Sequence, residues 1–196
     1  MFLWDWFSGL MTYLGLWRKQ GKLVFTGLDN SGKTTLLYLL SEQIEPSYYR
    51  RNNMYREAAQ LTLGDVCYSI YELSSACGVK KWKDQFDTLD GIVYFIDTTD
   101  RDRFEESKQE LDSLLCHEQI AKVPILVLAN KIDRPCVASE EEIKQVFGLQ
   151  QLTTGKGNVP LSELQTRPLE VFICSVLKRH GYAEGFKWLD QYTNAK

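Results

Sequence analysis

Residues 22–40, KLVFTGLDNSGKTTLLYLL, join a short apolar run to a helix-like run through a glycine-rich turn. The apolar run, 22–27, has the length and composition of a buried strand, and TTLLYLLSEQ (34–43) has a helical pattern. Between them, GLDNSGKT (27–34) matches the spacing G-x-x-x-x-G-K-T of a phosphate-binding loop. A strand before this loop and a helix after it favour phosphate binding over an ordinary turn.

Each part of this loop has a physical reason to hold phosphate. Glycines let backbone N–H groups surround the phosphates, and the helix that follows adds the positive end of its dipole. Lys33 is expected to reach the β- and γ-phosphates as a point charge, and the Thr34 hydroxyl to hold Mg²⁺. The nucleotide-binding residues predicted in this loop are Asp29, Asn30, Ser31, Gly32, Lys33, Thr34 and Thr35.

The tetrapeptide NKID (130–133), at the end of the apolar run VPILVLAN, predicts which base is bound. The Asp133 carboxylate can accept from both N1–H and the exocyclic amine of guanine, a paired donor that adenine lacks. We place Asn130 at the other purine edge and the Lys131 stem over the ring. Such a site rejects the wrong base, because its polar groups would be left unpaired. The alternative is a plain polar loop, which the upstream phosphate loop disfavours.

Apolar runs alternate with helical patterns along the rest of the chain, which predicts a layered α/β fold. The expected strands are 60–63 and 66–73, a hairpin around Gly64-Asp65, then 90–97, 123–130 and 169–176; the expected helices are 103–119, one that begins at a Ser139 cap, and 182–192. We predict one domain, 21–196, with a central, mostly parallel six-stranded sheet and helices on both faces. CSVL, at the end of the last strand, is expected to contact the base through the backbone N–H groups of Ser175, Val176 and Leu177.

Bulk composition excludes several classes of protein. An apolar fraction of 44% with 25% charged residues is typical of a globular protein. The net charge of -3 gives no reason to expect nucleic acid as a partner. The five cysteines are widely spread without a CxxC pair, which indicates reduced thiols of the cytosol rather than disulfides or a zinc site.

Residues 1–20 form a separate segment that begins MFLWDWFSGLMTYLGLW. Written as a helix, it has one narrow polar stripe and bulky apolar side chains elsewhere. We predict an amphipathic helix whose residues 1–17 lie in a membrane interface; the alternative is a helix packed on the protein's own core. The segment lacks the basic region and the cleavage site of a signal peptide. Asp5 and Arg18-Lys19 disfavour a membrane-spanning helix. Phe2 excludes N-myristoylation.

With these motifs in order, the chain resembles the secretion-associated Ras-related (Sar) GTPases, which start COPII coat assembly on the endoplasmic reticulum. The resemblance rests on GKLVFTGLDNSGKTTLL, VPILVLANKIDRP, TTGKGNV and RPLEVFICSVLKRHGYAEGFKWLDQY. It implies the small GTPase fold, GTP or GDP with Mg²⁺, and GTP-dependent insertion of the N-terminal helix. The implied partners are the membrane of the endoplasmic reticulum, COPII-type coat subunits, an exchange factor and an activating protein. The implied location is the cytoplasm and the cytosolic membrane face, with the Golgi as a second membrane.

Two segments depart from the family pattern. The first switch, 42–60, contains no threonine to sense the γ-phosphate through Mg²⁺. The second switch reads YELSS (71–75), where Glu72 replaces an aspartate and serines replace two glycines, and no histidine or glutamine follows to orient water. We take Glu72 as a metal ligand beside Thr34 and, with Lys33, as a catalytic residue. Because positioning supplies most of the acceleration in such enzymes, intrinsic hydrolysis is expected to be very weak.

Three functions remain open on sequence alone. The first is a divergent GTPase that relies on a partner for missing groups. The second is a pseudo-GTPase, a nucleotide-bound membrane or coat-binding module with negligible hydrolysis. The third is another P-loop enzyme such as a nucleotide kinase, against which NKID argues.

Overall fold

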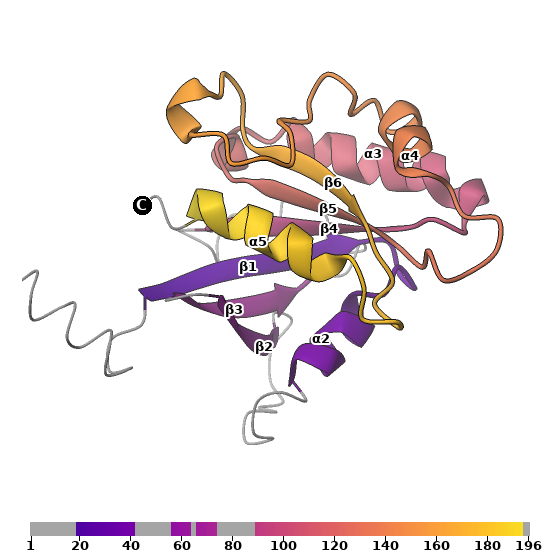
Figure 1. Ribbon diagram of the computed structural model, residues 1–196, viewed down its shortest axis with the longest axis horizontal. Coiled ribbons are helices and arrows are strands. Elements are labelled where there is room, and N and C mark those ends of the chain that lie inside the picture. Colours follow the sequence, from indigo (N-terminus) through magenta and orange to yellow (C-terminus); the bar gives the residue numbers. More distant parts are fainter. Residues whose placement is uncertain (1–18, 42–55, 64–65, 74–88, 194–196) are drawn as a thin grey trace, which may run out of the picture.

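A six-stranded sheet forms the centre of the computed structural model, which describes residues 19–41, 56–63, 66–73 and 89–193 (Figure 1). The strand order is β2-β3-β1-β4-β5-β6. The strands are β1 (Lys19–Gly27), β2 (Arg56–Leu63), β3 (Val66–Glu72), β4 (Gly91–Asp97), β5 (Ile125–Asn130) and β6 (Leu169–Ile173). The helices are α2 (Lys33–Ser41), α3 (Phe104–Leu115), α4 (Glu140–Val146) and α5 (Tyr182–Thr193), with 3-10 turns η3 (Arg101–Arg103), η4 (Glu118–Ile120) and η5 (Leu161–Glu163).

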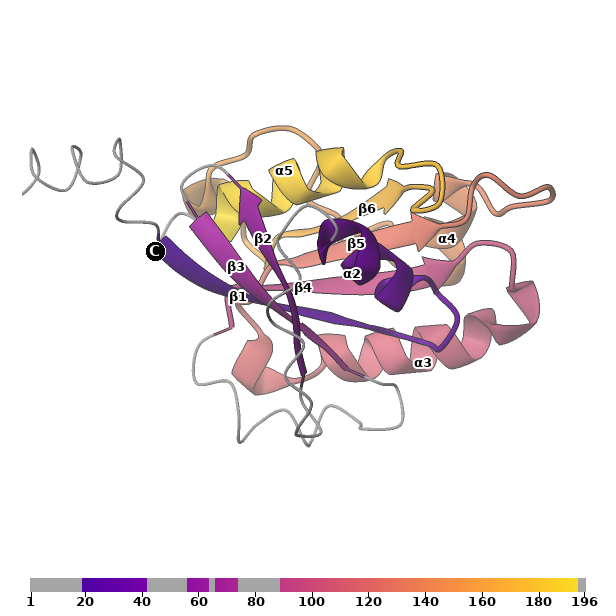
Figure 2. The same cartoon turned by 90° about the horizontal axis from the view of Figure 1, so that it is seen from below.

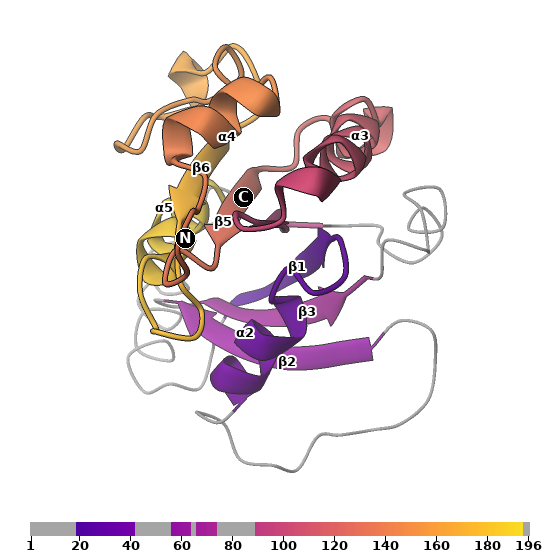
Figure 3. The same ribbon diagram turned by 90° about the vertical axis from the view of Figure 1, so that its right-hand side faces the viewer.

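The strand pairing confirms a mostly parallel sheet. β1 pairs in parallel with β3 and β4, and β4-β5 and β5-β6 are also parallel, while β2 is antiparallel to β3 as the predicted hairpin requires. All five parallel strands therefore end at one edge, where ligands bind in open α/β sheets. Figure 3 faces this edge, with α2 following directly from the loop after β1.

Some boundaries differ from those expected. β1 begins at Lys19 and β2 at Arg56, so both strands are longer at their amino ends than predicted. The helix expected over 103–119 ends at Leu115. After the C-cap residue Cys116 the chain forms a separate 3-10 turn, η4. The predicted cap of α4 is confirmed: the Ser139 hydroxyl accepts from the Glu142 N–H at 3.2 Å.

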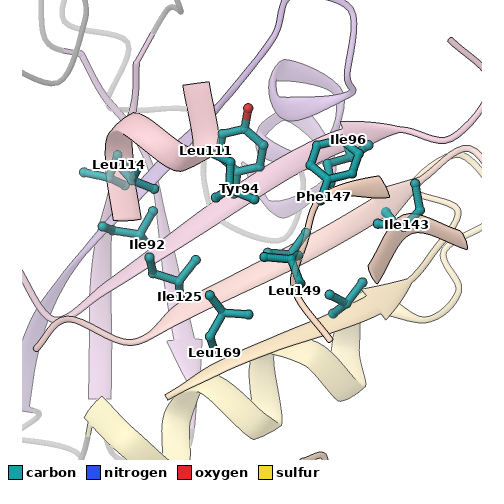
Figure 4. Packing of buried hydrophobic residues seen from close by; sticks show 14 of the residues in the cluster. Ile92, Tyr94, Ile96, Leu111, Leu114, Ile125, Ile143, Phe147, Leu149 and Leu169 are labelled. Atoms are coloured by element: carbon teal, nitrogen blue, oxygen red, sulfur yellow. The ribbon is translucent and has the colours of Figure 1, made fainter. Parts of the chain in front are cut away.

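Alternate residues of each central strand pack into two separate cores. On β4, Ile92, Tyr94 and Ile96 face α3 and α4, whereas Val93 and Phe95 face α2 and α5. Figure 2 shows the sheet between α5 and α3. Figure 4 shows labelled side chains of the first core, with those of β4 against α3 and the segment that follows α4. Strands buried on both faces explain why these runs read as continuously apolar.

The remaining predictions about the chain fall partly outside the described residues. Cys67, Cys116, Cys136 and Cys174 are free, as expected of reduced thiols, and Cys77 lies outside the described ranges. The predicted membrane-binding helix, 1–17, also lies outside them. Among the helices that the structure does describe, none is both long and apolar enough to cross a bilayer.

Candidate nucleotide-binding site

The loop between β1 and α2 has two glycines that no other residue can replace without strain. Gly27 has φ +124°, and a Cβ there would lie 2.4 Å from the Phe95 carbonyl oxygen. Gly32 has φ +104°, and a Cβ there would lie 2.2 Å from Nδ2 of Asn130. These glycines turn the chain sharply at the end of a buried strand and let the loop approach β5. The loop therefore has the local geometry that its sequence motif predicts.

Lys33 is held at the base of this loop. Its ammonium donates to the carbonyl oxygens of Gly27 at 2.8 Å and Leu28 at 2.7 Å, and the residue is 6% exposed. Burial lowers the pKa of Lys33, although the negative charges of Glu72 and Asp29 oppose this shift. An ammonium group has three donors, so one stays available beside the N-terminus of α2. The contact between Lys33 and the phosphates stays a prediction.

Thr34 and Glu72 meet at the edge of the site. The Thr34 hydroxyl donates to Oε1 of Glu72 at 2.6 Å, and Glu72 is the last residue of β3. In nucleotide sites Mg²⁺ is bound by one or two protein oxygens together with phosphates and water. These two hard oxygen donors fit such an ion, and Thr34 and Glu72 are the residues that would hold it. In the described part of the chain, no three His, Cys, Asp or Glu side chains gather as a metal site of their own.

Asn130 connects the segments of the site. Its Nδ2 donates to the Ser31 carbonyl oxygen at 2.9 Å, and its Oδ1 accepts from the Val176 N–H at 3.0 Å. The Cys174 thiol also contacts Oδ1 at 3.8 Å, and Asn130 is 3% exposed. The phosphate loop, β5 and the end of β6 are therefore joined through one buried amide. The contact that we expected between Asn130 and the purine stays a prediction.

Asp133 is oriented by a hydroxyl group at the end of β6. The Ser175 hydroxyl donates to Oδ1 of Asp133 at 2.5 Å and accepts from the Lys178 N–H at 3.0 Å. The hydrogen bond from Ser175 holds the pKa of Asp133 below its ordinary value, although partial burial opposes the shift. The hydrogen bond from Ser175 therefore orients the Asp133 carboxylate and favours its charged form, and its contact with guanine stays a prediction.

The backbone N–H groups after β6 are mostly engaged within the protein. The Ser175 N–H donates to the His180 carbonyl oxygen at 2.9 Å, and the Val176 N–H donates to Asn130. A base oxygen would have to share the Val176 N–H with Asn130. Leu177, the third predicted contact, is 64% exposed.

Asp97 is a site residue that the sequence motifs did not identify. Its Oδ2 lies 2.6 Å from the Lys131 ammonium, and its Oδ1 accepts from the N–H and hydroxyl of Thr99. Burial raises the pKa of Asp97, but the hydrogen bonds from Lys131 and Thr99 outweigh it and the pKa is lowered. Lys131 has φ 74°, an unfavourable backbone conformation for lysine. Asp97 pairs with Asn130 in the register of β4 and β5. The sequence predicted both strands, 90–97 and 123–130, so placing them side by side would have brought their last residues together.

Other predicted residues lie around this centre. Asp29, Asn30 and Thr35 are exposed at the loop and the start of α2, and Ser31 is buried with its hydroxyl donating to the Leu28 carbonyl oxygen at 2.7 Å. Asn30 has φ 59°, a conformation that asparagine tolerates better than most residues. Most of the first switch, and the second switch after Leu73, lie outside the described residues.

Comparisons with known proteins identify the family of this chain. A family model described as "Arf: ADP-ribosylation factor family" matches residues 7–193. The small COPII coat GTPase SAR1 of Giardia intestinalis is 40% identical over 189 residues, covering 96% of this chain and 97% of that protein. SAR1 of Nicotiana tabacum is 37% identical over 198 residues, covering 98% and 99% of the two chains.

Two further matches are to Arf-like proteins. ADP-ribosylation factor-like protein 3 of Caenorhabditis elegans is 31% identical and covers 87% of this chain and 86% of that protein. The structure of the Arl6 small GTPase from Trypanosoma brucei with the nucleotide analogue GppNp matches with a TM-score of 0.69. That match covers 90% of this chain and 98% of the other at 24% identity, which shows the fold. The chain belongs to the ADP-ribosylation factor family of small GTPases and, within it, to the Sar-type proteins.

Proposed function

We propose that this protein is a guanine-nucleotide switch of COPII-type vesicle coat assembly, which binds GTP or GDP with Mg²⁺ and hydrolyses GTP slowly. Relatives named as small COPII coat GTPases, which match nearly the whole chain, support the coat assignment. The observation that carries nucleotide binding is the buried amide of Asn130, which joins the phosphate loop to the strand ends that hold Asp133 and Ser175. The family favours a GTPase over a nucleotide kinase.

Base specificity is tested by competition. A fluorescent GDP bound to the purified protein should be displaced by excess GTP or GDP, and hardly at all by ATP. Asp133→Ala should weaken GDP binding strongly, because two guanine donors lose their acceptor. Asp112→Ala, which makes the same substitution at an exposed position of α3, is the matched control. Displacement by ATP as effective as that by GTP would reject a guanine site.

Slow hydrolysis is proposed from the second switch. Its residues 74–79 lack both the glycine pair and a water-positioning side chain, so Glu72 is the one residue to which we assign a remnant of the hydrolytic role. Single-turnover measurements with γ-labelled GTP, alone and with a COPII-type activating protein, test this. Slow release alone and faster release with the partner are expected. Release of no phosphate in either reaction would instead establish the binding-module alternative.

Membrane attachment is proposed for residues 1–17, on the cytosolic face of the endoplasmic reticulum, with coat subunits and an exchange factor as partners. The aromatic residues of this segment favour insertion into the interface. Deleting residues 1–17 should abolish flotation with liposomes while GDP affinity stays unchanged. Equal flotation of the truncated and full-length proteins would contradict the proposal.

A further inference from the structure

The phosphate-binding loop contains a carboxylate of its own. Asp29 stands between Gly27 and Gly32, and its side chain is 76% exposed. It is close enough to Lys33 for its negative charge to raise the pKa of that ammonium group. A carboxylate at this place repels an anion that the rest of the loop attracts. A cation beside Asp29 would offset this repulsion.

Arg103 supplies this cation. It lies in η3, just before α3, and its terminal nitrogen Nη2 donates to Oδ1 of Asp29 at 2.7 Å. Glu106, on the first turn of α3, accepts from Nε of Arg103 at 2.8 Å and from Nη2 at 3.2 Å. The guanidinium is thus held by its own helix on one side while it bonds to the loop on the other. The hydrogen bond from Arg103 holds the pKa of Asp29 below its ordinary value, so the pair is ionised.

We propose that Arg103 is a positioning residue that neutralises Asp29 and thereby keeps the loop from discriminating against GTP relative to GDP. This inference rests on the proposed guanine-nucleotide function. An ion pair as exposed as this one contributes little to the stability of the fold, so its effect is expected in nucleotide preference. The terminal phosphate of GTP brings negative charge that GDP lacks. An unpaired Asp29 therefore repels GTP more strongly than GDP.

Binding measurements on the full-length protein with Mg²⁺ test the proposal. The dissociation constants of GDP and of a non-hydrolysable GTP analogue are compared for the unmodified protein, Arg103→Ala, Asp29→Asn and the double variant. Arg103→Ala should weaken the analogue relative to GDP by roughly three- to tenfold, the size of one nearby charge at a protein surface. In the Asp29→Asn background, Arg103→Ala should have no further effect. Arg103→Lys keeps the charge without the planar guanidinium group, so its ratio of dissociation constants should lie between those of the unmodified protein and Arg103→Ala.

Arg101 offers a matched control in the same turn. It carries the same charge but pairs with Glu142 of α4, away from the loop. Arg101→Ala should leave the ratio of the two dissociation constants unchanged; an equal effect of both arginines would overturn the proposal. An effect of Arg103→Ala that persists in the Asp29→Asn background would also overturn it, since Arg103 would then act on the nucleotide directly. If the unmodified protein binds guanine nucleotides while Arg103→Ala changes nothing, this inference alone fails. If it binds none, the proposed function fails as well.

Discussion

The side-chain amide nitrogen of Asn130 lies 2.9 Å from the main-chain carbonyl oxygen of Ser31, so the last residue of β5 holds the loop that follows β1. The same amide group accepts the Val176 N–H after β6. Three strand ends that are far apart in sequence are therefore positioned by one buried side chain. Both nucleotide binding and local stability are therefore expected to depend on Asn130.

Asn130→Ala should lower the free energy of unfolding of the nucleotide-free protein by about 2–6 kcal/mol. The substitution leaves the Ser31 carbonyl and the Val176 N–H buried without their partner, at about 1–3 kcal/mol each. Urea denaturation measures the change. Asn158→Ala, at an exposed position, should stay within about 0.5 kcal/mol of the unmodified protein. Equal effects of the two substitutions would show that the amide does not connect the segments.

Gly32→Ala should abolish nucleotide binding and destabilise the protein. A side chain at this position has an unfavourable φ of +104°, and its Cβ would lie 2.2 Å from Nδ2 of Asn130. The loop must then shift away from β5. Isothermal titration with GDP measures the loss, and Gly157→Ala is the control because no atom lies within 4 Å of a Cβ there. Tight GDP binding by Gly32→Ala would mean that the loop relaxes without cost.

Much of this architecture follows from local sequence patterns. The apolar runs that became β1, β4 and β5 are buried on both faces, which makes their signal strong and their order easy to predict. The phosphate-loop glycines were predictable for the same reason, since the motif encodes a backbone conformation. The end of α3 was less predictable, because the polar residues His117, Glu118 and Gln119 are compatible with either a helix or the turn η4.

The side-chain partners of the site could not be predicted in the same way. Asp97 and Arg103 contact Lys131 and Asp29 only after the sheet brings β4 beside β5 and β1. Their own segment, DTTDRDR, has no motif that marks either residue as part of a nucleotide site. Such contacts depend on register and side-chain direction, which a single sequence constrains weakly. The motif residues of the site can therefore be predicted from the sequence, whereas the residues that orient them cannot.

Glu72→Gln should weaken Mg²⁺-dependent retention of nucleotide while leaving the fold stable. The Thr34 hydroxyl now donates to the Glu72 carboxylate at 2.6 Å, and an amide is a poorer ligand for Mg²⁺ than a carboxylate. The rate of GDP release, measured across a range of Mg²⁺ concentrations, should require roughly tenfold more Mg²⁺ for half-maximal slowing, the effect of about 1.4 kcal/mol. Glu163→Gln, in the exposed turn η5, removes the same charge as a control. An unchanged Mg²⁺ dependence of Glu72→Gln would remove Glu72 from the metal site.

Ser175→Ala should raise the pKa of Asp133 toward its ordinary value of 3.8. The Ser175 hydroxyl donates to this carboxylate at 2.5 Å and favours its ionised form, although partial burial opposes the shift. A carboxyl group with a lowered pKa in the folded state stabilises the protein above its unfolded pKa, and this stability is lost as the pH falls through the folded pKa. The difference in free energy of unfolding between the unmodified protein and Ser175→Ala should therefore be constant above about pH 5 and shrink below about pH 4. Denaturation at a series of pH values, with Ser162→Ala as the exposed control, measures it. A difference that grows on acidification would show that Ser175 stabilises the protonated form of Asp133 instead.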